Sequence, residues 1–150
     1  MASGSRILIE LAVTAVPFVV LWWAMWLSLE HGYWLTLLLA VPTAGFVVRL
    51  FMIQHDCGHG SFFRSRPAND WLGRAIGVVT LTAYGHWRHR HAVHHATSGN
   101  LDQRGVGDVH TLTVAEFRRL PMWRQLAYWL ARSPFAVLGV GPIYVFVFKH

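Results

Sequence analysis

Histidine is the residue type whose number and spacing in this chain point most directly to chemistry. Ten of the 150 residues are histidines, and eight of them fall between His55 and His110. His55 and His59 are four residues apart, so on a helix, at about 100° per residue, their side chains point only about 40° apart. Both rings can therefore approach one metal ion.

A second cluster, HWRHRHAVHH, occupies residues 86–95. On one helix, His91, His94 and His95 lie within about 100° of one another and form a face with three ligands. His86 and His89 lie about 140° and 160° around that helix from His91, and we expect them to point elsewhere.

The ligand type narrows the choice of metal. Neutral imidazole binds zinc, copper, iron and nickel, and the single Cys57 offers neither a disulfide nor the thiolates of a closed zinc site. Five clustered imidazoles exceed the needs of one tetrahedral ion. We therefore interpret them as part of a cage for two iron ions. The alternative is an exposed polar helix that contacts lipid headgroups.

The composition predicts that membrane helices position these histidines. Hydrophobic residues make up 54% of the chain and charged residues 13%, whereas soluble domains carry about 45–50% and about 25%. Residues 7–29 are almost wholly apolar and predict a first spanning helix, because a signal peptide would have a shorter apolar region and a cleavage site. Residues 33–53 predict a second span, which Pro42 should kink.

The two spans predict a helical hairpin followed by a cytoplasmic segment. The turn between the spans lacks Lys and Arg and is flanked by aromatic residues, so we expect it to face away from the cytoplasm. Residues 54–127 are polar and rich in arginine, which places this metal-binding segment on the cytoplasmic side. The net charge of +6 thus reports topology and contact with membrane lipid, and we expect no nucleic-acid binding.

Shorter elements are predicted within and after this segment. Residues 71–84 are too short an apolar stretch to span and predict an interfacial or packed helix, which Asn69 or Asp70 would cap. Thr113 and Glu116 fit a capping box at the start of another helix. Residues 128–148 predict the beginning of a third span. The expected fold is an all-α integral membrane protein whose 150 residues form one incomplete domain.

Both histidine clusters resemble known motifs. HDCGHGSFF at residues 55–63 and HAVHH at residues 91–95 are similar to the first two histidine boxes of the membrane fatty acid desaturases. ANDWLG at residues 68–73 and GNLDQRGVGDVHTLTVAEF at residues 99–117 look like bacterial and plastid desaturases of the Δ12 (omega-6) type. The resemblance covers residue 45 to the end of the chain.

The resemblance implies a non-haem diiron centre on the cytoplasmic face. It implies that five histidines are iron ligands, namely His55, His59, His91, His94 and His95. Asp56 would accept a hydrogen bond from a ligand imidazole, and Gly58 would permit close helix packing. We expect Arg49 to extend its side chain to the membrane interface and to take no part in catalysis.

The activity implied for the intact enzyme is the O2-dependent introduction of a double bond into an acyl chain. The resemblance further implies an acyl lipid or acyl thioester as substrate, a ferredoxin or cytochrome b5-like electron donor, and a multi-pass protein of the bacterial inner membrane. Two alternatives remain open. One is a related diiron hydroxylase or ketolase of lipids or carotenoids, and the other is a noncatalytic metal-binding membrane protein.

The family's third histidine box, another HxxHH, does not occur in these 150 residues. We interpret the chain as a fragment of a longer gene product that is inactive by itself. The alternative is an incomplete, inactive paralogue.

Overall fold

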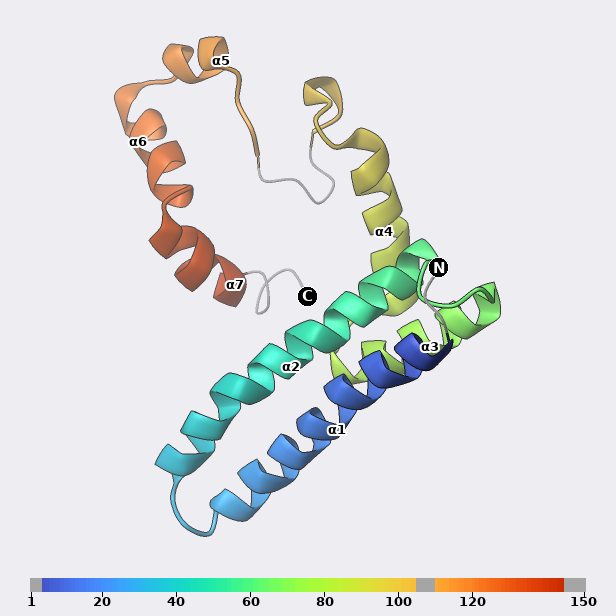
Figure 1. Cartoon of the computed structure of the whole chain (residues 1–150). Coiled ribbons are helices and arrows are strands. Elements are labelled where there is room, and N and C mark those ends of the chain that lie inside the picture. The colour runs from blue at the N-terminus through green and yellow to red at the C-terminus, as the bar shows by residue number, and fades with distance from the viewer. Residues whose placement is uncertain (1–3, 105–109, 145–150) are drawn as a thin grey trace. The chain divides into compact units, whose positions relative to one another are not determined.

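A computed structural model describes residues 4–104 and 110–144, and every regular element within these ranges is helical (Figure 1). The elements are α1 (Gly4–Ser28), α2 (Tyr33–His59), α3 (Arg66–Val79), α4 (Tyr84–Thr97), the 3-10 turn η1 (Leu101–Gln103), α5 (Val114–Arg119), α6 (Met122–Ala131), the π-helical turn η2 (Ala136–Val140) and α7 (Gly141–Tyr144). They form two compact units, Met1–Thr97 and Ser98–His150. The predicted all-α fold is confirmed.

Helices α1 and α2 form an antiparallel hairpin (Figure 1). They contain 25 and 27 residues, and an 18-residue stretch within each has a mean hydropathy of 2.1 and 2.0 respectively, so each is long and apolar enough to cross a membrane. Most of their apolar side chains are exposed, an arrangement that a bilayer favours and water does not. Both predicted spans are therefore present as helices, and α2 continues without interruption through Pro42.

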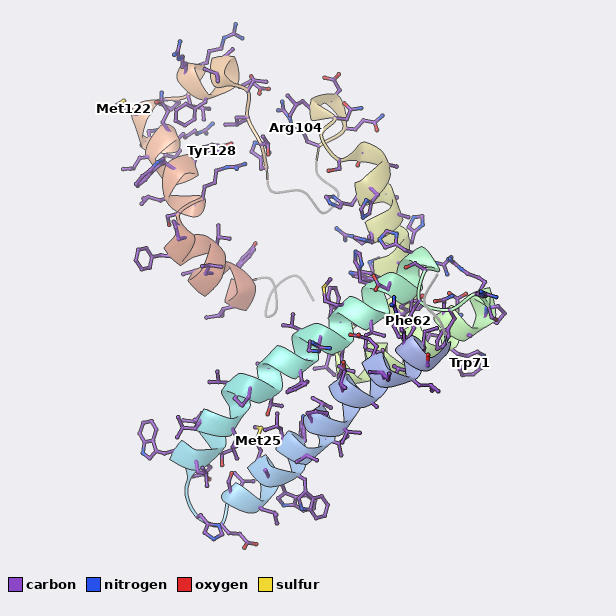
Figure 2. All side chains as sticks on the ribbon, viewed as in Figure 1. Met25, Phe62, Trp71, Arg104, Met122 and Tyr128 are labelled. Carbon is purple, nitrogen blue, oxygen red and sulfur yellow. The ribbon has the colours of Figure 1, made fainter. Side chains whose placement is uncertain are left out.

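Small polar contacts join the two helices of the hairpin. Ser28 Oγ lies 2.7 Å from Thr36 Oγ1, and the Thr43 hydroxyl donates to the sulfur of Met25 at 3.2 Å. Figure 2 shows Met25 between α1 and α2. The Ser28 hydroxyl donates to the carbonyl of Met25 at 2.7 Å, and the single O–H of Thr43 is shared between the Met25 sulfur and the carbonyl of Leu39, so both hydroxyls have partners in apolar surroundings.

Arg49, which the sequence predicts to extend to the membrane interface, makes polar contacts with α1. Its Nη2 donates to Glu10 Oε1 of α1 at 3.0 Å, and its Nε and Nη2 lie 3.4 Å from the Thr14 hydroxyl. The two charged side chains are about half exposed, at 49% and 50%. The guanidinium thus ties the two helices together, and the ion pair offsets the cost of placing each charge beside an apolar span.

Helix α2 is longer than the predicted span and continues past Ile53 to His59. Gly60 ends it in the left-handed conformation, with φ of 70°, and its N–H donates to backbone carbonyls of the last turn. This extension lies beside α3 and α4, in the region where the buried core of the first unit forms. That core consists of Leu50, Ile53, Cys57, Ile76 and Tyr84.

The start of α3 differs from the prediction. Ser65 caps the helix by accepting from the Ala68 N–H, and Pro67 occupies its first turn. Asn69 and Asp70 therefore lie inside α3, and the prediction that one of them caps it was wrong. The buried Asn69 instead bonds the N–H and C=O of Phe63, which fixes the loop that follows α2.

Two contacts hold α4 against its neighbours. Arg88 donates to Asp70 of α3 at 2.8 Å, and the Tyr84 ring packs on Gly73, where a Cβ atom would overlap the ring. Gln54, fully buried on α2, accepts a hydrogen bond of 2.7 Å from Thr80 at the end of α3. The first two contacts join α4 to α3, and the third joins α3 to α2. Together they give α4 a defined position against the end of α2.

The predicted capping box of the second unit is confirmed. The Thr113 hydroxyl accepts from the Glu116 N–H, and the Glu116 carboxylate accepts from the Thr113 N–H. Arg104 holds the same carboxylate at 2.9 and 3.1 Å. This bidentate pair joins α5 to the segment that precedes residues 105–109.

The predicted third span, residues 128–148, begins within α6. Helix α6 ends at Ala131, and a turn at Arg132 and Ser133 separates it from η2 and α7. Arg132 lies over the Tyr128 ring and donates to the carbonyl of His110. Residues 145–148 of that prediction lie outside the described residues.

Glu116 provides a pH-dependent test of the second unit. Hydrogen bonds from Arg104, and then from Thr113, lower the pKa of Glu116 from 4.5 to about 2. Because the folded pKa is the lower one, the carboxylate stabilises the segment above pH 4.5, and the contribution is lost as the pH falls towards 2. Carboxyl chemical shifts from NMR should give a midpoint near 2. In R104Q the midpoint should rise, and an unchanged midpoint would contradict the pairing.

Candidate metal centre

The last two turns of α2 supply the first histidine pair. His55 and His59 stand one turn apart, with ring centroids separated by 4.6 Å. They share this face because α2 stays helical to His59, as the four-residue spacing predicts. The loop after Gly60 is held by Asn69, which bonds the backbone of Phe63 just beyond the helix end that carries the pair.

The second pair comes from α4 and faces the first. His91 lies 4.6 Å from His55 and 5.1 Å from His59, measured between ring centroids. The Nε2 atom of His91 is 3.1 Å from that of His59 and 3.0 Å from that of His95. One ring nitrogen from each of His55, His59, His91 and His95 lies within 4.8 Å of the other three. Two segments far apart in sequence thus converge on one point.

The nitrogen geometry fits a metal ion better than a set of hydrogen bonds. A neutral imidazole carries one N–H, so His91 Nε2 can donate to at most one of its two Nε2 neighbours. At metal–nitrogen distances of about 2.0–2.1 Å, two nitrogens bound at a right angle are about 2.8–3.0 Å apart, and a wider angle increases the separation. The observed 3.0 and 3.1 Å match that spacing. In addition, His55 Nδ1 is buried and has no hydrogen-bond partner.

His91 is held in the uncharged form that metal binding requires. Burial, followed by the neighbouring His55 and His95, lowers the pKa of His91 from 6.5 to about 4. At pH 7 its lone pair is therefore available. An acidic ligand set would attract calcium or magnesium, whereas four imidazoles favour a transition metal.

His94 lies beside this group without joining it. Its ring is 6.2 Å from that of His91 and 5.7 Å from that of His95. The described structure thus brings together four of the five predicted ligands, and the part of His94 stays a prediction. Neither His86 nor His89 is in the group, in keeping with the direction expected from their helical positions.

Asp56, the predicted hydrogen-bond partner of a ligand imidazole, is adjacent to the group. Its Oδ1 lies 3.6 Å from His55 Nδ1, beyond hydrogen-bond distance, and its side chain is 54% exposed. The role of Asp56 therefore stays a prediction.

Sequence reasoning missed Trp87, the residue that packs most closely on the histidine group. Its ring stacks on His91 with centroids 4.8 Å apart and planes at 13°, and it faces Gly58 of α2. The position of Trp87, one turn before His91 on the same helix, was the available signal. The close packing expected at Gly58 is confirmed, since a Cβ atom there would lie 2.8 Å from Trp87.

The chain thus combines a hairpin of two helices able to span a membrane with converging imidazoles at the end of the second helix, and these imidazoles are a donor set suited to a transition metal. The fatty acid desaturase family model matches residues 32–150, and the chain belongs to that family. The resemblance seen in the histidine boxes is thereby confirmed.

Several relatives bear desaturase names. A fatty acid desaturase of Bacillus subtilis (strain 168) is 50% identical over 143 residues, which cover 95% of this chain and 41% of the relative. An sn-1 acyl-lipid omega-3 desaturase (ferredoxin) of Synechocystis sp. is 47% identical over 53 residues, 35% of this chain and 15% of the relative. The chain thus spans about two fifths of the length of the Bacillus protein. No solved structure matches.

Proposed function

We propose that this chain is the part of a fatty acid desaturase that carries its first two histidine boxes. The intact enzyme would use dioxygen to introduce a double bond into an acyl chain. The supporting observation is that, in a member of this family, ring nitrogens of His55, His59, His91 and His95 converge within 4.8 Å beside a hairpin able to span a membrane. These imidazoles would hold iron, and His94 is proposed as a fifth ligand.

The residues of the chain would contribute by holding and orienting. Two iron ions bound at the histidines would supply the reduction of dioxygen and the attack on unactivated C–H bonds. Asp56 is proposed to accept the Nδ1–H of His55, which would fix that ring and leave its other nitrogen for the metal. The anchored ends of α2 and α4 would keep the ligands in place while an acyl chain is aligned against them.

The proposed topology places the metal centre at the cytoplasmic face of a multi-pass protein, in a bacterial inner membrane. The arginines of residues 54–127 support the cytoplasmic side by the positive-inside rule. Residues 128–148 would lead into a third span. The rest of the intact enzyme would supply the remaining membrane-spanning helices.

An acyl lipid is the proposed substrate, and ferredoxin the proposed electron donor. The name of the Synechocystis relative, an acyl-lipid desaturase with ferredoxin, supports both choices. The apolar exposed surface of α1 and α2 also suits a substrate that already resides in the bilayer. An acyl thioester and a cytochrome b5-like donor are the competing candidates.

The deciding experiment expresses the full-length gene product in a bacterial host that makes only saturated acyl chains. Iron per purified chain and double bonds in total lipid are measured together. We expect about two irons per chain and new double bonds that depend on oxygen. Zinc in place of iron would overturn the diiron proposal. Hydroxylated or oxo products with iron present would overturn the desaturase assignment in favour of a related hydroxylase or ketolase.

A further inference from the structure

Trp87 fills the space between α2 and α4 at the histidine group. Its ring stacks on His91 at 4.8 Å and 13°, meets Phe51 of α2 edge to face at 5.4 Å, and lies 6.0 Å from the ring of His55. It therefore touches one histidine from each of the two pairs. No hydrogen bond between described side chains joins the indole to the metal ligands, so its influence is one of shape.

Gly58 makes room for this indole. A Cβ atom at residue 58 would lie 2.8 Å from Cζ3 and 3.4 Å from Cη2 of Trp87. Both atoms belong to the six-membered part of the indole, and atoms at 2.8 Å must move apart. Because Gly58 lies between the two ligands of α2, any movement there changes the distance from His59 to His91 directly.

An imidazole needs such a support to aim its nitrogen. The torsion that rotates a histidine ring about its last bond is broad, so a solvent-exposed ring samples many directions for Nε2. Stacking against a rigid indole restricts that rotation, and the rotation matters most for His91, whose Nε2 lies at 3.0–3.1 Å from two other ligands. Trp87 is thus placed where it can set both the plane of the His91 ring and the spacing between the pairs.

We propose that Trp87, seated against Gly58, is a positioning residue that shapes the metal centre. The proposal rests on the proposed function, namely that these histidines bind a metal. Trp87 neither binds the metal nor takes part in the reaction. It determines how the ligands of α2 and α4 meet.

Four variants and one control test the pairing. W87F removes Cζ3 and Cη2 but keeps an aromatic face for His91, whereas W87L removes the face. G58A adds the atom that collides with Trp87, and G58A/W87F adds it after the collision partner has gone. G45A is the matched control for G58A, because it lies on the same helix and a Cβ atom there meets nothing within 4 Å.

The readouts are the affinity of the purified full-length protein for Co2+ and the visible spectrum of the bound ion, which reports the arrangement of its ligands. We expect W87L and G58A each to weaken binding about 10- to 100-fold and to change the spectrum, as is typical when a residue that orients a ligand is lost. W87F should weaken it less. The double variant should resemble W87F, so that its effect is smaller than that of G58A alone.

The outcomes separate the two proposals. If the unsubstituted protein binds no Co2+, the metal centre itself is overturned, and the positioning role falls with it. If it binds Co2+ and W87L gives the same affinity and spectrum, only the positioning role is overturned. The same conclusion follows if the effects of G58A and W87F add in the double variant, because the steric pairing then has no part in the loss.

Discussion

Replacement of His91 by alanine is expected to remove metal from the full-length protein and to lower its rate of double-bond formation by more than about 100-fold. Loss of a residue that merely orients a ligand costs about 10- to 100-fold in affinity, and loss of the ligand should exceed that range. His91 stands at the centre of the group, since its Nε2 lies within 3.1 Å of the Nε2 atoms of both His59 and His95. Iron analysis and lipid analysis of the same preparation measure both effects.

H89A is the matched control. His89 lies on the same helix, is exposed and is outside the histidine group, so its removal should leave iron content and activity near their original values. Equal losses in H91A and H89A would show that α4 needs its histidines for folding. They would thus contradict the assignment of His91 to the metal centre. H94A gives a further comparison, because His94 lies beside the group and its proposed ligand role predicts a loss of iron.

Replacement of Gly73 by alanine is expected to destabilise the first unit by roughly 1–3 kcal/mol, the usual cost of overpacking a core. In the middle of an exposed helix this change would stabilise by about 0.5–1 kcal/mol, because glycine has the larger entropy to lose. The sign reverses here because the new Cβ atom would overlap the Tyr84 ring, which is 4% exposed and belongs to the core. Thermal unfolding in detergent measures the change.

G85A provides the comparison for this prediction. Gly85 lies in the first turn of α4, directly after Tyr84, and a Cβ atom there meets nothing within 4 Å. G85A should therefore match or exceed the original stability. If G73A proves as stable as G85A, α3 and α4 do not pack as described. Because Tyr84 begins the helix that carries His91, G73A should also lower iron content, even though Gly73 is not close to any histidine in sequence.

The elements of this protein follow from local patterns in the chain. Apolar blocks longer than a bilayer is thick predicted α1 and α2, and the polar residues 30–32 predicted the turn between them. A four-residue spacing placed His55 and His59 on one side of a helix, and the capping box at Thr113 marked the start of α5. Each of these signals lies within one continuous segment of the chain, which is why sequence alone could reveal it.

Other features depend on contacts between distant segments. The helical spacing defined a face of α4 about 100° wide that held three histidines, yet it did not say which edge of that face meets α2. In the structure Trp87 packs against Gly58, His91 and His95 face the first pair, and His94 lies beside the group. The cap of α3 was misassigned because Asn69, a common capping residue, is occupied in holding the Phe63 backbone.

By itself, therefore, the sequence determined the all-helical membrane fold, the candidate ligands and the family. Hydrophobic length, helical period and ligand chemistry are properties of single segments. Each can be recognised without knowing which other segments lie nearby. The tertiary structure decided which four imidazoles converge, how α4 is oriented and what lies behind the ligands. Those outcomes depend on close packing between helices, in which the presence or absence of one Cβ atom decides how closely two helices can approach each other.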